Sequence, residues 1–171
     1  MISHDPLFGL IDKETRRQRE GIQLIPSENF ASAAVREAVG SPLMNKYSEG
    51  YPHRRYYEGN DIIDEIEDLA IERARALFKV PRANVQPYSG SPANAAVLFG
   101  LLEAGDVIMG MKLASGGHLT HGHPNVTFSG KYFKTIQYGL NVAARIDLDE
   151  VRALAHQYKP KLMIIGTTAY P

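Results

Sequence analysis

The chain has 171 residues, of which 44% are hydrophobic and 22% charged, as in an ordinary globular domain. Its 19 basic and 19 acidic residues cancel, which argues against a nucleic-acid partner bound through bulk positive charge. It contains no cysteine, which excludes disulfides and thiolate zinc sites. The first ten residues lack a signal pattern and the apolar runs are too short to cross a bilayer, so we expect a cytoplasmic protein without a membrane partner.

The N-terminal residues predict a helical arm. Residues 5–20 begin with an Asp-Pro pair that supplies a cap and a first-turn proline, and the helix becomes very polar after its first turns. Residues 22–26 are a short extended piece. The polar turn Ser27-Glu28-Asn29 follows, and on its own it requires no function. Residues 32–39 predict a short helix that ends at Gly40.

Residues 45–59 predict a long loop that is dense in aromatic and ionisable side chains. These are Tyr47, Glu49, Tyr51, His53, Arg54, Arg55, Tyr56 and Tyr57. Tyrosines supply flat faces with a hydroxyl, and a loop carboxylate such as Glu49 is a candidate acid–base group. The alternative is a plain surface or subunit-contact loop.

After this loop, helices and strands alternate. Asn60 or Asp61 caps an amphipathic helix that ends before Pro81. The further segments are strands at 84–88, 107–111, 132–138 and 162–165, and helices at 92–102 and 147–157. This alternation predicts an α/β domain with a largely parallel sheet. The last strand reads as a buried inner strand that a following helix would cover, so we expect the chain to be truncated.

Residues 89–91, Ser-Gly-Ser, lie where a strand-like run meets a helix. Free backbone N–H groups, small hydroxyls and the positive end of the helix dipole together suit a phosphate. No Gly-Lys-Ser/Thr follows, so the P-loop pattern is absent and the phosphate would belong to a cofactor other than ATP. The alternative is an ordinary turn with a serine cap.

Residues 116–123 bring three histidines close together in sequence, at His118, His121 and His123. Their spacing is compatible with metal ligation, although no acidic residue lies nearby to complete the set. An imidazole stacked on a flat aromatic cofactor is a second interpretation. Solvated loop histidines are the third.

Seven segments, in one order along the chain, closely resemble the serine hydroxymethyltransferase family. They are Leu-Ile-Pro-Ser-Glu-Asn at 24–29, Asn-Lys-Tyr-Ser-Glu-Gly-Tyr-Pro at 45–52, Arg-Tyr-Tyr at 55–57, Asn-Val-Gln-Pro at 84–87, Ser-Gly-Ser at 89–91, Ala-Asn at 93–94 and Gly-Gly-His-Leu-Thr-His-Gly at 116–122. The resemblance extends from about Ile22 to Pro171. Threonine aldolase and other enzymes of this fold are the runner-up, because they lack the Ser-Glu-Asn turn and the Tyr-Ser-Glu-Gly-Tyr-Pro loop.

The resemblance implies a pyridoxal 5'-phosphate enzyme of the aspartate aminotransferase-like fold (fold type I). Residues 1–50 would be an N-terminal arm with the start of an interface loop, and residues 51–171 the first part of the cofactor-binding large domain. The implied reaction converts serine and tetrahydrofolate to glycine and 5,10-methylenetetrahydrofolate. The full-length protein would be a homodimer or tetramer, and the resemblance implies neither a metal nor nucleic acid.

The resemblance also implies roles for individual residues. The cofactor would be bound by Tyr47 from the neighbouring subunit and by Ser89, Gly90, Ser91, His118 and Thr168. The substrate would be bound by Ser27, Glu49, Tyr56 and Tyr57, and the folate by Leu113, Gly117, His118 and Leu119. Glu49 would transfer protons, with His118 and Tyr57 also counted as catalytic.

The chain departs from the family pattern at His53 and Glu58, where glycine is usual, and at Thr168, where serine is frequent. The family's Schiff-base lysine, pyridine-nitrogen aspartate and carboxylate-binding arginine lie downstream of Pro171. We therefore expect these 171 residues alone to be inactive. A non-catalytic binding or regulatory module derived from the same fold is the alternative.

Overall fold

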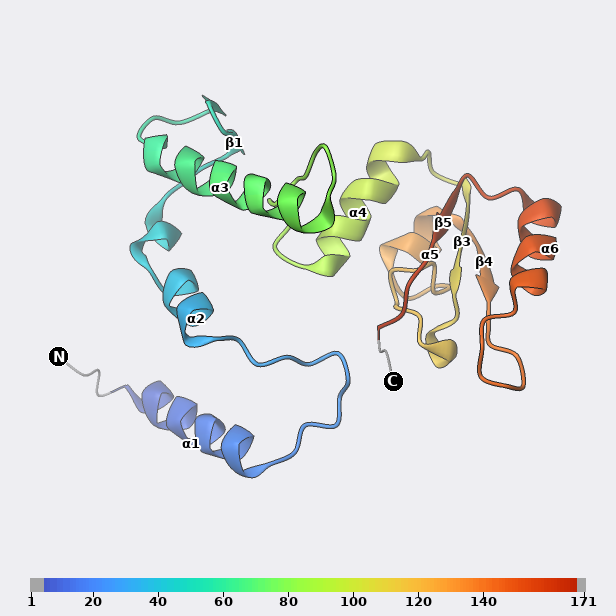
Figure 1. Cartoon of the computed structure of the whole chain (residues 1–171), viewed down its shortest axis with the longest axis horizontal. Coiled ribbons are helices and arrows are strands. Elements are labelled where there is room, and N and C mark those ends of the chain that lie inside the picture. The colour runs from blue at the N-terminus through green and yellow to red at the C-terminus, as the bar shows by residue number, and fades with distance from the viewer. Residues whose placement is uncertain (1–4, 169–171) are drawn as a thin grey trace. The chain divides into compact units, whose positions relative to one another are not determined.

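The computed structural model describes residues 5–168, which divide into two compact units (Figure 1). One unit is Phe30–Leu102. The other combines the residues up to Asn29 with those from Glu103 onward. Within residues 5–168, no helix has both the length and the hydrophobicity needed to span a membrane.

The predicted N-terminal helix is confirmed as α1, Pro6–Glu20. The Asp5 side chain caps it by accepting a hydrogen bond from the Leu7 N–H at 2.8 Å. The chain then runs extended into a turn, where the Glu28 N–H donates to the Ile25 carbonyl at 3.0 Å.

The Phe30–Leu102 unit contains three helices, a 3₁₀ turn and a small hairpin. Its elements are α2 (Ala33–Val39), η1 (Pro42–Asn45), β1 (Gly50–Tyr51), β2 (Arg54–Arg55), α3 (Asp61–Phe78) and α4 (Gly90–Leu101). Gly40 ends α2, as the sequence predicts, while Ser32, expected inside the helix, lies just before it and caps it. The predicted long loop holds a short antiparallel hairpin, in which Gly50 pairs with Arg55.

The predicted strand at 84–88 is wrong, because the structure gives this segment no strand pairing. The Gln86 N–H donates to Asn84 Oδ1 at 3.0 Å instead of to a neighbouring strand. Pro87 has no N–H and cannot donate a hydrogen bond to a neighbouring strand. The segment is an extended connection into α4.

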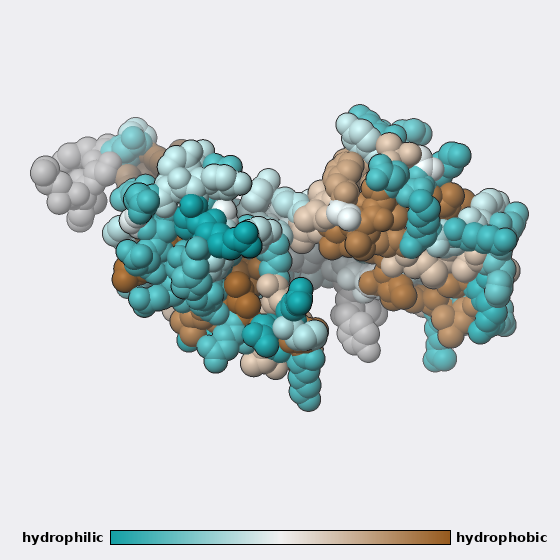
Figure 2. All heavy atoms as spheres, turned by 90° about the horizontal axis from the view of Figure 1, so that it is seen from above, coloured by the Kyte–Doolittle hydropathy of each residue, from teal (hydrophilic) through white to brown (hydrophobic). Residues whose placement is uncertain are grey.

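Helix α3 is confirmed, yet its apolar positions are largely exposed in this structure. Ile62, Leu77 and Phe78 expose 63%, 75% and 70% of their surface. Figure 2 shows hydrophobic side chains reaching the surface among polar ones.

The other unit is built on a parallel sheet of three strands, as the alternation of elements predicts. The strands are β3 (Val107–Met111), β4 (Lys134–Tyr138) and β5 (Leu162–Ile164), in the order β4-β3-β5. The connecting elements are η2 (Leu113–Ser115), α5 (Phe128–Tyr132) and α6 (Leu148–Tyr158). Tyr132, which we expected in a strand, instead ends α5.

Strand β5 was expected to be a buried inner strand, and this prediction is wrong for the described residues. It pairs only with β3 and lies at the edge of the sheet. Met163 is 37% exposed, and Ile165, just beyond the strand, is 78% exposed. A strand with a neighbour on one side cannot enclose its side chains as a central strand does.

The two faces of this sheet have different covers. On one face Met109, Met111 and Tyr138 are buried against Val151 and other residues of α6. On the other, Gly122 approaches the side chains of Ile108 and Thr135. The histidine-rich loop therefore lies directly on the sheet.

Candidate functional site

The predicted site residues divide between the two units, and the geometry is defined within each. The Phe30–Leu102 unit holds Tyr47, Glu49, Tyr56, Tyr57, Ser89, Gly90 and Ser91. The other unit holds Ser27, Leu113, Gly117, His118, Leu119 and Thr168.

The hairpin loop, residues 46–58, brings Tyr47 and Tyr57 together. Their ring centroids lie 4.9 Å apart in an edge-to-face arrangement with an interplanar angle of 86°. The buried Asn60 at the start of α3 fixes the end of this loop, since its Nδ2 donates to the Tyr57 carbonyl at 2.8 Å. Both tyrosine side chains remain available at the surface, at 67% and 49% exposure.

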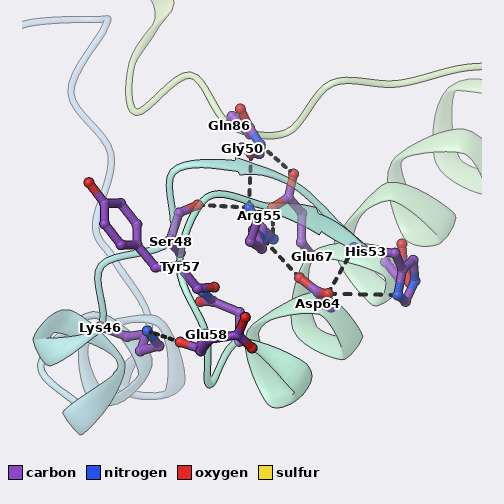
Figure 3. A network of polar contacts seen from close by, with 12 residues as sticks. Lys46, Ser48, Gly50, His53, Arg55, Tyr57, Glu58, Asp64, Glu67 and Gln86 are labelled. Carbon is purple, nitrogen blue, oxygen red and sulfur yellow. Dashed lines mark hydrogen bonds and ion pairs between the residues drawn. The ribbon is translucent and has the colours of Figure 1, made fainter.

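Arg55 is the centre of the polar network beneath this loop (Figure 3). Its Nη1 donates to the Ser48 carbonyl at 2.8 Å and to the Gly50 carbonyl at 2.9 Å. These two carbonyls lie on either side of Glu49. The Arg55 side chain is only 5% exposed, so a buried guanidinium supports the loop backbone through charge-assisted hydrogen bonds.

Two carboxylates of α3 hold this guanidinium in place. Arg55 Nε lies 2.8 Å from Asp64 Oδ1, and Nη2 lies 2.6 Å from Glu67 Oε2. The backbone N–H of His53 and the Arg55 side chain hold the pKa of Asp64 below its usual value. The partners, Glu67 first, raise the pKa of Arg55, so both groups stay charged.

His53, one of the departures from the family pattern, occupies the hairpin turn with a φ of 61°. This left-handed conformation favours glycine and carries strain in other residues. Its N–H donates to Asp64 Oδ2 at 2.8 Å, and its Nε2 lies 3.0 Å from Asp68 Oδ2. These two contacts with α3 hold His53 in the left-handed conformation. Glycine would adopt this conformation without such support.

Glu58, a second departure from the family pattern, contributes its backbone to the same loop. The Lys46 Nζ donates to the Glu58 carbonyl at 2.8 Å and to the Tyr47 carbonyl at 3.2 Å. The start and the end of the hairpin loop are thus tied together by one ammonium group.

Glu49 lines an open hollow of about 580 Å³ in the Phe30–Leu102 unit. The hollow is bordered by Ser48, Glu49, Gly50, Arg55, Ile63, Ile66, Glu67, Ala70, Val85 and Gln86. The Glu49 carbonyl accepts a hydrogen bond from the Tyr56 N–H at 3.1 Å, so its backbone is fixed. Its residue surface is exposed, which suits a group that exchanges protons with a ligand.

The predicted phosphate cradle lies at the N-terminus of α4. Ser89 is the extended N-cap residue, with φ −160° and ψ 172°, and its side chain makes no capping hydrogen bond. Pro92 has no N–H and the Ala93 N–H bonds the Ser89 carbonyl at 3.2 Å, so Gly90 and Ser91 supply the N–H groups of the first turn. The space beside Gly90 is open, with nothing within 4 Å of a Cβ built there.

His118 is held by its own loop. Its Nδ1 accepts the Thr120 N–H at 3.1 Å and lies 2.8 Å from Thr120 Oγ1. An acceptor at Nδ1 places the ring proton on Nε2. The ring orientation is therefore set before any ligand arrives.

The three histidines do not form a metal site in this structure. His121 Nδ1 accepts the His118 N–H at 3.3 Å, and His123 Nδ1 lies 3.1 Å from the Pro124 carbonyl. No cluster of three metal-ligating side chains occurs among residues 5–168. Burial, followed by the proximity of His118, lowers the pKa of His121, so the neutral imidazole is favoured.

The predicted folate residues surround the same loop. Leu113 is 44% exposed in η2. Gly117 has no room for a side chain, because a Cβ would lie 2.0 Å from the Met111 carbonyl oxygen. Thr168 joins this region, since its N–H donates to the Gly116 carbonyl at 2.9 Å. Ser27 lies in an exposed turn.

Three residues that hold the hairpin loop have no role predicted from the sequence: Arg55, Glu67 and Gln86. Asn60 was predicted as a possible helix cap, but its side chain makes no capping hydrogen bond and bonds the loop instead. Arg55 and Gln86 lie inside the quoted motifs, where a polar residue among loop or apolar neighbours was a usable signal. The acidic residues of α3 recur three apart, at Asp64 and Glu67, which places both on one face of the helix. That pattern was a second signal.

Comparisons with known proteins identify relatives along almost the whole chain. A sequence model of the family described as serine hydroxymethyltransferase matches residues 2–171. The serine hydroxymethyltransferase of Acidothermus cellulolyticus is 59% identical over 169 residues, which cover 98% of this chain and 39% of that relative. Those of Leptothrix cholodnii and Desulfotalea psychrophila are 58% and 55% identical, over 97% and 98% of this chain and 40% and 39% of their own lengths. The chain thus spans about two fifths of the length of the curated relatives it matches.

Proposed function

Because this chain belongs to the serine hydroxymethyltransferase family, we propose that it forms the N-terminal part of a transferase that converts serine and tetrahydrofolate to glycine and 5,10-methylenetetrahydrofolate. The observation that carries the proposal is identity of 55–59% to relatives of that name over 97–98% of this chain. The proposal includes fold type I, with residues 1–50 as the arm and residues 51–171 as the first part of the large domain.

Ser89, Gly90 and Ser91 are proposed to bind the phosphate of pyridoxal phosphate. The uncapped Ser89 hydroxyl, the N–H groups of Gly90 and Ser91 and the open space beside Gly90 fit a dianionic group. When bound, the cofactor supplies an electron sink for bonds to the substrate's α-carbon. His118, fixed by Thr120, offers a ring to stack on a flat pyridine. Tyr47 and Thr168 are the remaining proposed contacts.

Glu49 is proposed to hold and move the proton at the hydroxyl oxygen of serine. Its fixed backbone and exposed residue surface support this role. Tyr56, Tyr57 and Ser27 are proposed to bind the amino acid, with Tyr57 oriented through its contact with Tyr47. Leu113, Gly117 and Leu119 are proposed to lie along the folate beside His118.

We place the working protein in the cytoplasm as a homodimer or tetramer. Exposed apolar side chains on α3 support further protein contacts, as Ile62, Leu77 and Phe78 are each more than half exposed. A polypeptide limited to these 171 residues is proposed to be inactive, because its lysines occur in no segment that resembles the family's cofactor-linking lysine.

The test uses a hybrid subunit, in which this chain is continued by the downstream part of the Acidothermus cellulolyticus relative. We expect it to form glycine from serine, in a reaction that requires both tetrahydrofolate and pyridoxal phosphate. The 171-residue polypeptide should give none. A folded, cofactor-loaded hybrid subunit without this activity contradicts the proposed function and favours a non-catalytic module, while turnover by the short polypeptide contradicts its inactivity.

A further inference from the structure

The side chain of Gln86 joins the segment before the phosphate cradle to the loop that carries Glu49 (Figure 3). Its Nε2 donates to the Gly50 carbonyl at 2.7 Å and to Glu67 Oε1 at 2.8 Å. Gln86 precedes Ser89 by three residues, and Gly50 directly follows Glu49. One amide group therefore connects two parts of the proposed site that are far apart in sequence.

The Gly50 carbonyl is an effective place to hold Glu49. Gly50 has a φ of 109°, and a Cβ there would lie 2.5 Å from the Arg54 carbonyl oxygen, so the hairpin allows this backbone little alternative. Gln86 and Arg55 both donate to its carbonyl, at 2.7 Å and 2.9 Å. The Gly50–Tyr51 peptide group, one residue beyond Glu49, is thus fixed by two side-chain donors.

Gln86 is itself held in position. Its N–H donates to Asn84 Oδ1 at 3.0 Å. The Glu67 carboxylate accepts from Gln86 through one oxygen and from Arg55 through the other, at 2.8 Å and 2.6 Å. Because both Glu67 oxygens are engaged, the carboxylate fixes the orientation of the Gln86 amide. The Nε2 group is therefore already aimed at the Gly50 carbonyl.

We propose that Gln86 is a positioning residue for Glu49. It holds the Gly50 carbonyl and thereby keeps the Glu49 carboxylate in register with the cofactor cradle three residues beyond Gln86. The inference rests on the proposed role of Glu49 in proton transfer. Proton transfer requires donor and acceptor within hydrogen-bond reach, so a small displacement of this loop should slow turnover more than it weakens substrate binding.

The experiment compares Gln86→Leu and Gln86→Glu in the hybrid subunit. Leucine removes the amide, and glutamate keeps the shape but replaces the N–H donors with a carboxylate that repels the Glu67 carboxylate and the Gly50 carbonyl. We expect kcat to fall by about tenfold or more, with the KM for serine within about twofold of the parent. Backbone amides across residues 48–56 should exchange hydrogen faster, while pyridoxal phosphate content stays at the parental level. Gln157→Leu, at an exposed position of α6, is the matched control and should change none of these values.

Parental kcat or parental hydrogen exchange in the variants overturns the inference, as does a loss of turnover that is explained by loss of cofactor. If leucine prevents folding, the glutamate variant supplies the same test. An active parent with unaffected variants refutes only the role of Gln86. A cofactor-loaded parent without transferase activity refutes the proposed function, and the positioning role falls with it.

Discussion

Arg55 and Asp64 form an ion pair in which both side chains are largely buried. Arg55 Nε lies 2.8 Å from Asp64 Oδ1, and the side chains are 5% and 10% exposed. The pair joins the second strand of the hairpin to the first turn of α3. It thereby fixes the loop that carries Glu49, and its strength should decide how rigid that loop is.

Replacing Arg55 should loosen the hairpin loop that it supports. Arg55→Lys keeps the charge but cannot reproduce four directed hydrogen bonds, so hydrogen exchange across residues 48–56 should rise. Arg55→Met leaves two buried carboxylates without their partner and should lower the melting temperature of the hybrid subunit further. Arg17→Lys, in an exposed pair with Glu14, should leave the melting temperature within about 2 °C of the parent. Equal effects at both sites would contradict a structural role for the buried pair.

The sheet core should depend strongly on Met109. Its side chain is fully buried against α6, and removing it as Met109→Ala should cost about 2–5 kcal/mol in the free energy of unfolding. Met163 is its Cα partner on the edge strand β5 and is 37% exposed. Met163→Ala should cost clearly less in the same denaturant titration. A larger effect at Met163 would mean that β5 is covered in solution.

His121 should make stability dependent on pH. Burial lowers its pKa, so between this pKa and the ordinary value the unfolded chain binds more protons than the folded one. The contribution is therefore favourable above about pH 6.5 and is lost as the pH falls toward the lowered pKa. The melting temperature of the hybrid subunit should fall less with acid in His121→Gln than in the parent. His156→Gln, at an exposed position of α6, is the control and should retain the parental slope.

The Ser89–Ser91 cradle should be selective for phosphate. A Ser89→Ala, Ser91→Ala double variant of the hybrid subunit should bind pyridoxal phosphate about tenfold or more weakly, because two hydroxyl donors are removed. Binding of pyridoxal, which has no phosphate, should remain near the parental value. Titration by absorbance gives both constants. A parallel loss for the two ligands would place the phosphate elsewhere.

Local signals predicted the elements that are fixed locally. The cap at Asp5 could be predicted because its side chain bonds an N–H two residues away, and the caps at Ser32 and Asp147 are equally local. The strand at 84–88 was not, since an apolar run with Pro87 reads as a strand whether or not a partner strand accepts it. The edge position of β5 is likewise a property of the sheet, which residues 162–165 do not encode.

The candidate site shows the same division. Ser89–Ser91 and the loop at His118 could be proposed as site segments because their motifs are contiguous. The support around Glu49 was missed because Gln86 reaches Gly50 across 36 residues and Arg55 reaches Glu67 across 12. Which polar side chains become buried partners depends on how α3 packs under the hairpin, and helix periodicity alone does not specify that.

Glu49→Gln in the hybrid subunit tests the proposal that this chain supplies the proton-transfer group of a pyridoxal-phosphate transferase. The amide keeps the size of the side chain but cannot take or give the proton. Glycine formation from serine and tetrahydrofolate should fall by about a hundredfold or more, with cofactor content and hydrogen exchange across residues 48–56 unchanged. A variant that is folded and cofactor-loaded and turns over at the parental rate would contradict a proton-transfer role for Glu49.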